Sequence, residues 1–308
     1  MKKRVLILSG AYMCFDAYMQ ALPGGTNEAR GDGYKYVPGG TGIVAALTFR
    51  ALGLDGIFCS AVGSDRHGRE LTGFLEDAGV DRRFVKRVQK KETGLYMTIH
   101  EQSRAGRIIR FPGANEALTA EDIKAAFMVY PDAVYIQNDL PDGLAAYAAN
   151  VAANKGVPVF WHPCGPAKRS EPPIGVRLEA AVFEASEVGS YCGVEPTEYE
   201  KFLPAAMALA SRISAKHYII RIPDRGAFIY DGLHSEMAAE YPSTYLDENY
   251  APAVYGAAFC AAYIKTDGNA RKAAKCAAAA YAYSSSNEGG VGSVPSADDL
   301  IKFLKKDG

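Results

Sequence analysis

Residues 246–259, LDENYAPAVYGAAF, place a polar turn directly before a run of small and aromatic residues. Pro252 suits the first turn of a helix, because the N–H that proline lacks would have no partner there. The stretch therefore predicts a turn followed by a helix of small residues that starts near Pro252.

Outward from this stretch, short apolar runs alternate with helical patterns. The runs occupy residues 5–8, 57–62, 134–137, 157–161 and 218–220. Helix-starting residues stand between them, such as Thr119 with Asp122 three residues later, as in a capping box. Strands that alternate with helices imply a parallel sheet covered on both faces. The alanine-rich segment 270–283 predicts a closely packed helix.

Two segments interrupt this alternation. Residues 12–37 and 93–111 are extended and interrupted by polar residues, and the second contains two short strands around Gly106. This pattern predicts additional strands outside the alternating core. A small exposed sheet of this kind needs to be covered, for example by another subunit.

Several short motifs follow one another along the chain. They are Gly10 with Asp16, PGGTGIVAA at 38–46, AVGSD at 61–65, PGAN at 112–115, IQNDLP at 136–141 and FWHP at 160–163. Their order and spacing resemble the ribokinase-like (PfkB) carbohydrate kinases over nearly the whole chain. The resemblance implies a single ribokinase-like domain over 1–308, with a three-layer α/β/α core and a mainly parallel sheet. It also implies a small β lid at about 12–37 and 93–111, which closes the sugar site and pairs two subunits into a homodimer.

The resemblance further implies which residues contact a sugar. The corresponding positions here are Asp16, Gly39, Gly40, Asn115, Asp139 and His162. Val44 replaces an asparagine of the family, and His162 stands where the family has an aspartate before proline. The expected ligand is therefore a small polyhydroxylated molecule, in a pocket more apolar than is usual for the family.

The catalytic turn departs from the family pattern. The resemblance implies Asp, two variable residues and then Gly-Ala-Gly-Asp, whereas this chain has Asp247 followed by Tyr250, Ala251, Pro252 and Ala253. Alanine cannot accept the proton of an attacking hydroxyl, and proline has no N–H for a developing phosphoryl charge. Tyrosine also resists the positive φ that glycine supplies in such turns. Ordinary phosphoryl transfer is therefore not expected.

The nucleotide side departs in the same way. The family's Thr-x-Gly-x-x-Gly, which lines the ATP phosphates, corresponds to 221–226, where only Gly226 is kept and Pro223 replaces a glycine. Arg221 fits two roles, an anion partner or an internally salt-bridged side chain. The family's metal-linked Asn-x-x-Glu has a shifted match that ends at Glu195. ATP and Mg²⁺ are the cofactors that the resemblance implies, and both sites are degraded here.

Composition excludes other classes. A net charge of −1 and the lack of a lysine and arginine cluster give no footprint for nucleic acid. No apolar run approaches the roughly 20 residues of a membrane span. Six scattered cysteines without a C-x-x-C pair fit reduced thiols, and the N-terminal apolar run fits a first strand better than a signal peptide. A cytoplasmic protein is expected.

Three functions follow from these observations. The first is a noncatalytic binding or regulatory protein, a pseudokinase on the kinase scaffold. The second is an active ATP-dependent carbohydrate kinase that uses a displaced base. The third is a different enzyme activity on the same fold, with His162 as its acid or base.

Overall fold

The structure is a computed structural model of the chain. It describes residues 2–22, 28–101, 104–164, 171–245, 249–287 and 290–306.

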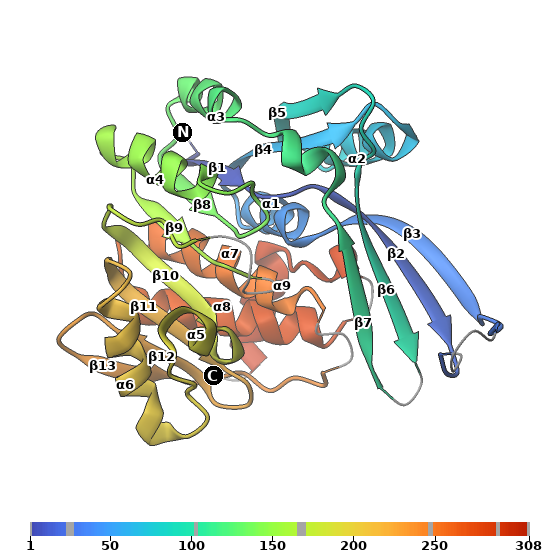
Figure 1. Cartoon of the computed structure of the whole chain (residues 1–308). Helices are drawn as coiled ribbons and strands as arrows, with labels where there is room; N and C mark the ends of the chain where they lie inside the picture. The colour runs from blue at the N-terminus through green and yellow to red at the C-terminus, as the bar shows by residue number, and fades with distance from the viewer. Residues whose placement is uncertain are drawn as a thin grey trace.

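A nine-stranded sheet forms the centre of the molecule (Figure 1). Its spatial order is β13-β12-β11-β10-β9-β8-β1-β4-β5. In chain order the strands are β1 (Arg4–Leu8), β4 (Asp55–Gly63), β5 (Asp81–Val88), β8 (Ala133–Ile136), β9 (Val159–Trp161), β10 (Leu178–Glu184), β11 (Ala215–Ile222), β12 (Gly226–Tyr230) and β13 (Ser235–Ala238). Neighbouring strands from β5 to β11 pair in parallel, whereas β12 and β13 complete the sheet as antiparallel strands. The mainly parallel sheet is confirmed.

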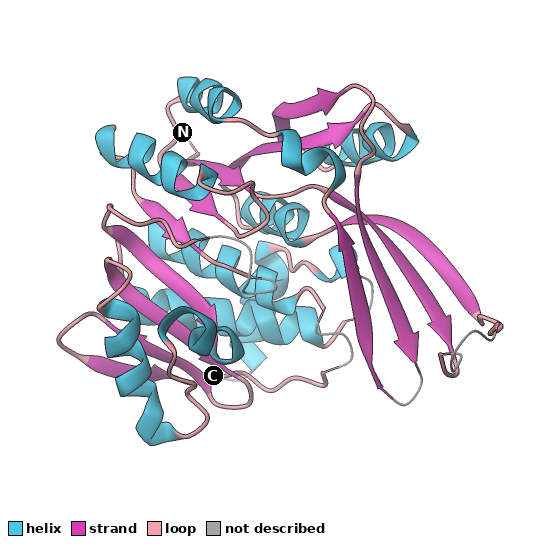
Figure 2. Cartoon of the chain, in the orientation of Figure 1, coloured by secondary structure: helices cyan, strands magenta, loops and turns pink. Residues whose placement is uncertain are grey.

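Helices cover both faces of this sheet (Figure 2). One face is covered by α1 (Thr41–Ala51), α2 (Arg66–Asp77), α7 (Ala251–Lys265), α8 (Ala270–Ser285) and α9 (Ala297–Lys306). The other is covered by α3 (Ala120–Ala126), α4 (Leu144–Asn154), α5 (Ala185–Cys192) and α6 (Tyr199–Ala210). Short 3-10 helices are η1 (Gly113–Ala117), η2 (Phe127–Val129) and η3 (Gly290–Ser293). The result is the three-layer α/β/α core that the motifs predict.

The strands are apolar on both faces because both are covered. In β1, Val5 and Ile7 pack with the α1 and α7 layer, while Leu6 and Leu8 pack with the α3 and α4 layer. Small side chains let α7 and α8 pack side by side, and nearly every α7 residue is buried. No helix in the described part of the chain is both long enough and apolar enough to cross a membrane.

A separate four-stranded sheet projects from the core as a lid (Figure 1). Its order is β3-β2-β6-β7, formed by β2 (Tyr12–Met19), β3 (Gly33–Gly39), β6 (Gly94–Glu101) and β7 (Arg104–Phe111). These strands lie where the sequence predicts the lid. Because side chains alternate along a strand, the lid has an inner face that includes Cys14 and Tyr96 and an outer face that includes Phe15 and Met97.

Candidate functional site

One row of side chains on the inner face of the lid contacts the core. Cys14, Tyr96 and Arg110 are cross-strand neighbours on β2, β6 and β7. Cys14 Sγ lies 2.9 Å from the hydroxyl of Tyr250, the residue before α7. The Tyr96 hydroxyl donates to Asp139 over 2.7 Å, and Arg110 forms an ion pair with the same carboxylate. The lid is therefore fastened to the core at α7 and at the loop after β8.

Burial keeps three of these groups neutral. It raises the pKa of the Cys14 thiol to about 11, and it raises the pKa of Tyr96 and of Tyr250 well above the ordinary value for a phenol. At neutral pH the thiol and both phenols are therefore protonated, and none of them is a ready base.

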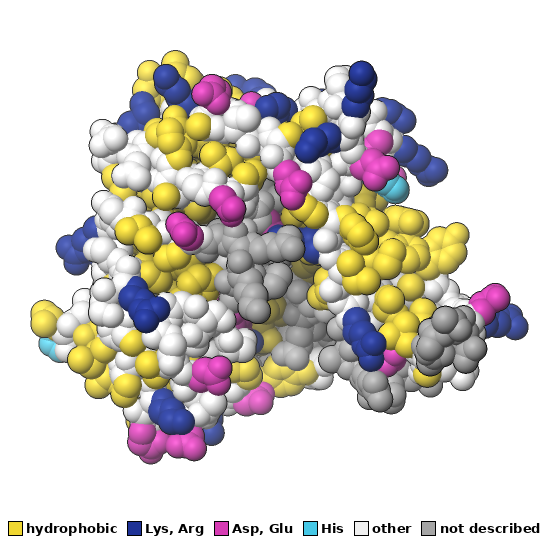
Figure 3. Space-filling model, in the orientation of Figure 1, with side chains coloured by type: hydrophobic (Ala, Val, Ile, Leu, Met, Phe, Trp, Pro, Cys, Tyr) yellow, Lys and Arg dark blue, Asp and Glu magenta, His cyan; other side chains and the backbone are white. Residues whose placement is uncertain are grey.

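A cavity of about 420 Å³ opens between the base of the lid and the loops that follow β7 and β8. Its lining residues are Tyr12, Arg110, Pro112, Asn115, Glu116, Asp139, Leu140, Pro141 and Asp142. Figure 3 shows acidic side chains (magenta) on this face of the core, on the side toward the lid. The Tyr12 and Tyr96 rings contact each other, with centroids 4.2 Å apart and planes tilted by 31°. An aromatic wall beside paired polar groups suits a small molecule with several hydroxyls.

Of the predicted sugar contacts, Asn115 and Asp139 meet in this cavity. The Asn115 amide, however, is already engaged by the chain itself. Its oxygen accepts from the Ala11 N–H at 2.8 Å, and its nitrogen donates to the Ala11 and Pro112 carbonyls at 2.9 Å. Asn115 therefore ties the start of β2 to η1, while Asp139 presents its carboxylate between Tyr96 and Arg110.

Asp16 lies further out along the lid and does not line the cavity. It is the cross-strand neighbour of Lys35 and Thr98, one row beyond Cys14. Its carboxylate lies 3.3 Å from His100 Nε2 and 3.9 Å from Lys35 Nζ. The structure therefore does not bring Asp16 together with Asn115 and Asp139.

Gly39 and Gly40 lie where β3 meets α1, and the Tyr250 side chain fills the space beside them. Gly40 has φ of 84°, which favours glycine. A Cβ on Gly39 would lie 2.5 Å from Cys14 Sγ and 2.7 Å from the Tyr250 hydroxyl oxygen. Tyr250 and Cys14 therefore pack against Gly39, while Tyr12 and Tyr96 pack against Gly40.

The described start of α7 carries no acidic side chain. Tyr250 precedes the helix, Pro252 lies in its first turn, and Ala253 is buried with 1% of its surface exposed. The first turn of α7 contains no acidic residue. Asp247, the opening residue of the motif, lies outside the described residues. At residue 253 the chain therefore offers no proton acceptor to a ligand hydroxyl.

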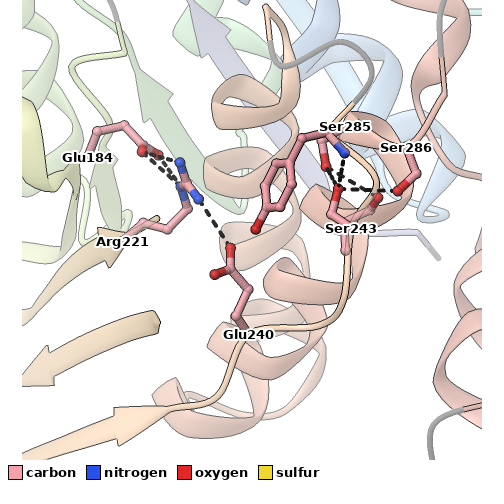
Figure 4. Close-up of polar contacts among 8 residues, drawn as sticks. Glu184, Arg221, Glu240, Ser243, Ser285 and Ser286 are labelled. Carbon is pink, nitrogen blue, oxygen red and sulfur yellow. Dashed lines mark hydrogen bonds and ion pairs between the residues drawn. The ribbon is translucent and has the colours of Figure 1, made fainter. Parts of the chain in front are cut away.

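Arg221 ends up inside an ion-pair network at the carboxyl end of β11 (Figure 4). Its guanidinium lies 2.7 Å from Glu184 and 3.3 Å from Glu240, and 3.8 Å from the centroid of the Tyr281 ring. Burial opposes its charge, but the Glu184 carboxylate outweighs this effect and raises the pKa of Arg221. Of the two roles predicted for Arg221, the internally salt-bridged one is observed.

The stretch that resembles a phosphate-lining loop does not fit a nucleotide. Arg221 is occupied by two carboxylates, and Pro223 has no N–H to donate. Gly226 has φ of 98°, and a Cβ there would overlap the backbone of Ala238 and Ala239. This glycine is therefore required by the pairing of β12 with β13, whether or not a phosphate ever approaches it.

Glu195 lies beyond the end of α5, where its side chain packs against Gly189. The acidic pair at the carboxyl end of β10 is instead Glu184 and Glu187, three residues apart, which form a capping box for α5. Within the part of the chain that the structure describes, no three histidine, cysteine, aspartate or glutamate side chains are grouped to hold a metal ion.

His162 lies in the core. Its ring is fully buried, Nδ1 lies 2.6 Å from the Tyr135 hydroxyl, and Gly256 of α7 packs against it. Burial lowers its pKa to about 3. The ring is therefore neutral at physiological pH and does not line the cavity, which argues against His162 as an exposed acid or base.

The sequence did not identify several residues that define this site. They are Tyr12, Tyr96, Arg110, Glu184 and Glu240. Strand periodicity gives a partial signal for Tyr96 and Arg110, because the two-residue period of a strand predicts which of its side chains share a face. The Glu184–Glu187 spacing directly after a strand is also visible in the sequence, whereas the pairing of Arg221 with Glu240 is not.

Comparisons with known proteins agree with this architecture. The family model described as pfkB family carbohydrate kinase matches residues 3–297. An ATP-dependent ribose-1-phosphate kinase from Halopiger xanaduensis is 25% identical over 98% of this chain and 99% of its own length. Ribokinase from Giardia lamblia superposes with a TM-score of 0.90 at 18% identity, covering 100% of both chains. Arabidopsis thaliana ribokinase, solved with ribose and ATP, superposes with a TM-score of 0.87 at 19% identity over 99% of each chain.

Proposed function

This chain belongs to the pfkB family of carbohydrate kinases, and we propose that it is a member that binds a small polyhydroxylated ligand without phosphorylating it. The single observation that carries the proposal is Ala253 at the start of α7, in the position of the family's catalytic aspartate. A kinase must remove the proton of the attacking hydroxyl, and alanine has no group that accepts it. Without that acceptor the protein can still bind a ligand, but it cannot take the proton from the hydroxyl that attacks the phosphate.

Two further features support a noncatalytic role. The Tyr250 side chain packs against Gly39, so a sugar that contacted this glycine would have to displace the tyrosine. Arg221 is held by Glu184 and Glu240, so its charge is not available to phosphate oxygens. The ligand pocket that remains is the cavity beside the lid.

The second candidate is an active ATP-dependent carbohydrate kinase with a displaced base. The observation that favours it is the relative from Halopiger xanaduensis, which is named as a kinase and aligns over nearly the full length of both proteins. This candidate requires a proton acceptor other than residue 253. It also requires a phosphate site that is compatible with Pro223 and Pro252.

We expect the unmodified protein to bind ATP with Mg²⁺ weakly or not at all and to form no phosphorylated sugar. Ala253→Asp alone should remain inactive, although a positioned base is commonly worth about 10² to 10⁴ in rate, because Tyr250 and Pro252 still block the turn. The triple change Tyr250→Gly, Pro252→Gly and Ala253→Asp should regain at most slight activity. Calorimetry measures ATP binding, and mass spectrometry of the sugar products measures transfer.

A catalytically active ribokinase, assayed with the same sugars, serves as the positive control. A dissociation constant for ATP in the low micromolar range would show that the nucleotide site survives. Robust turnover by the unmodified protein would reject the noncatalytic proposal and select the second candidate.

We also propose that two copies pair through the outer faces of their lids. Four large apolar side chains are exposed on this face: Tyr34 (72%), Tyr36 (45%), Ile109 (46%) and Phe111 (47%). Burying them in a dimer would remove apolar surface from water. Ile109→Lys should shift sedimentation toward a monomer, whereas Met207→Lys, on an exposed α6 position, should not. A wild-type protein that sediments as a monomer at all concentrations rejects the pairing.

A further inference from the structure

The cavity beside the lid has an excess of negative charge among its described lining residues. Asp139, Glu116 and Asp142 contribute carboxylates, and Arg110 contributes a guanidinium. Glu116 and Asp142 are exposed, and neither forms an ion pair with another described residue. A ligand in the cavity therefore lies near two carboxylates that have no ion-pair partner among the described residues.

The cation of the cavity is already neutralised. Arg110 forms its ion pair with Asp139, whose side chain is only 3% exposed and which also accepts the Tyr96 hydroxyl. A phosphate group that took Arg110 away would leave Asp139 buried without its counter-ion. Uncompensated burial of a carboxylate is costly, so the arginine is a poor receptor for an anion.

A buried arginine elsewhere at the carboxyl edge of the sheet is equally unavailable. Arg221 is 4% exposed and is paired with both Glu184 and Glu240. The first turn of α7, which in a kinase would supply N–H groups to phosphate, contains Pro252. The described lining of the cavity thus offers carboxylates to a ligand, whereas its guanidinium, on Arg110, is committed to Asp139.

We infer that the cavity selects a polyhydroxylated ligand that carries no phosphate, and that Glu116 and Asp142 exclude phosphate esters. The inference rests on the proposed function, because it specifies the ligand class of the same pocket. A neutral sugar is not repelled by the two carboxylates, and its hydroxyls can donate hydrogen bonds to them. A dianionic phosphate close to both carboxylates is repelled, and we expect this repulsion to weaken its binding by roughly tenfold or more at low ionic strength.

The test compares matched sugars with and without phosphate. Ribose with ribose 5-phosphate, and glucose with glucose 6-phosphate, are titrated at low ionic strength by ligand-observed NMR, with glucosamine as the cationic probe. The neutral member of a pair should bind at least about tenfold more tightly than its ester, and glucosamine should bind at least as well as glucose. Because exposed charges are screened by salt, the difference in affinity between sugar and ester should decrease as ionic strength rises.

A charge-neutralised variant assigns the effect to residues. In the double variant Glu116→Gln with Asp142→Asn, the ratio of the dissociation constants of ester and parent sugar should fall about tenfold. The control, Glu70→Gln with Asp77→Asn, removes the same charge from exposed positions on α2 and should keep the wild-type ratio.

The possible failures are distinguishable. An ester that binds as tightly as its parent sugar overturns the inference but leaves a ligand pocket in place. If the double variant keeps the wild-type affinity ratio, Glu116 and Asp142 do not cause the discrimination. If neither member of any pair binds saturably, the proposed function fails, and the inference fails with it.

Discussion

Arg221→Met should destabilise the protein by about 3–5 kcal/mol, the cost of breaking a buried ion pair by removing one partner. Arg221, Glu184 and Glu240 have side chains that are only 5%, 12% and 10% exposed. Methionine fills part of the volume but leaves two carboxylates without a cation. Burial already raises the pKa of Glu240 against the opposing charge of Arg221, so losing that charge favours protonation further. Urea unfolding at neutral pH measures the change in the free energy of unfolding.

Lys216→Met is the matched control for this experiment. Lys216 pairs with Glu179 over 2.9 Å, but its side chain is 48% exposed, and pairs of this kind contribute only about 0–1 kcal/mol. Adding Glu184→Gln and Glu240→Gln to Arg221→Met should recover part of the lost stability, because no unpaired charge remains. Equal costs for Arg221→Met and Lys216→Met would contradict a buried network at the end of β11.

This network also shows what sequence could and could not predict. The short apolar runs identified the central strands, because a strand covered on both faces must be apolar on both. The partners of Arg221 depend on tertiary structure. Glu184 is its cross-strand neighbour 37 residues away, and Glu240 reaches it from the segment after β13. No local pattern in the sequence encodes that second contact.

The position of Asp16 shows a related limit. A spacing of six residues after Gly10 suggests a sugar contact, and the two-residue period of a strand places Tyr12, Cys14 and Asp16 on one face. Periodicity identifies the face but not the residue that reaches the core. Cys14 makes that contact with Tyr250, whereas Asp16 pairs within the lid.

Asn115 illustrates a third limit, because its surroundings decide its role. The sequence places it in a turn after the second lid strand, and it does line the cavity. Its partner Ala11, however, is 104 residues away and uses both sides of the amide. A side chain predicted to hold a ligand therefore also holds the lid base together.

The contact between α7 and the sheet gives the second large expected effect. Gly256→Ala should destabilise the protein by about 1–3 kcal/mol, as overpacking of a core commonly does. A Cβ at this position would overlap the His162 ring. That ring is fully buried and its Nδ1 lies 2.6 Å from the Tyr135 hydroxyl, so moving it away from a new methyl group would disturb this contact. The loss should exceed the intrinsic helix advantage of alanine over glycine, which is about 1 kcal/mol.

Gly73→Ala in α2 is the matched control, because a Cβ there meets nothing within 4 Å. It should therefore be neutral or stabilising by up to about 1 kcal/mol. Combining Gly256→Ala with His162→Ala should cost less than the sum of the two single changes, since the smaller side chain makes room for the new methyl group. If the Gly256→Ala protein is as stable as the Gly73→Ala protein, then α7 does not pack closely against His162. The turn at Tyr250 and Ala253 would in that case lack the rigid support that fixes it against the lid.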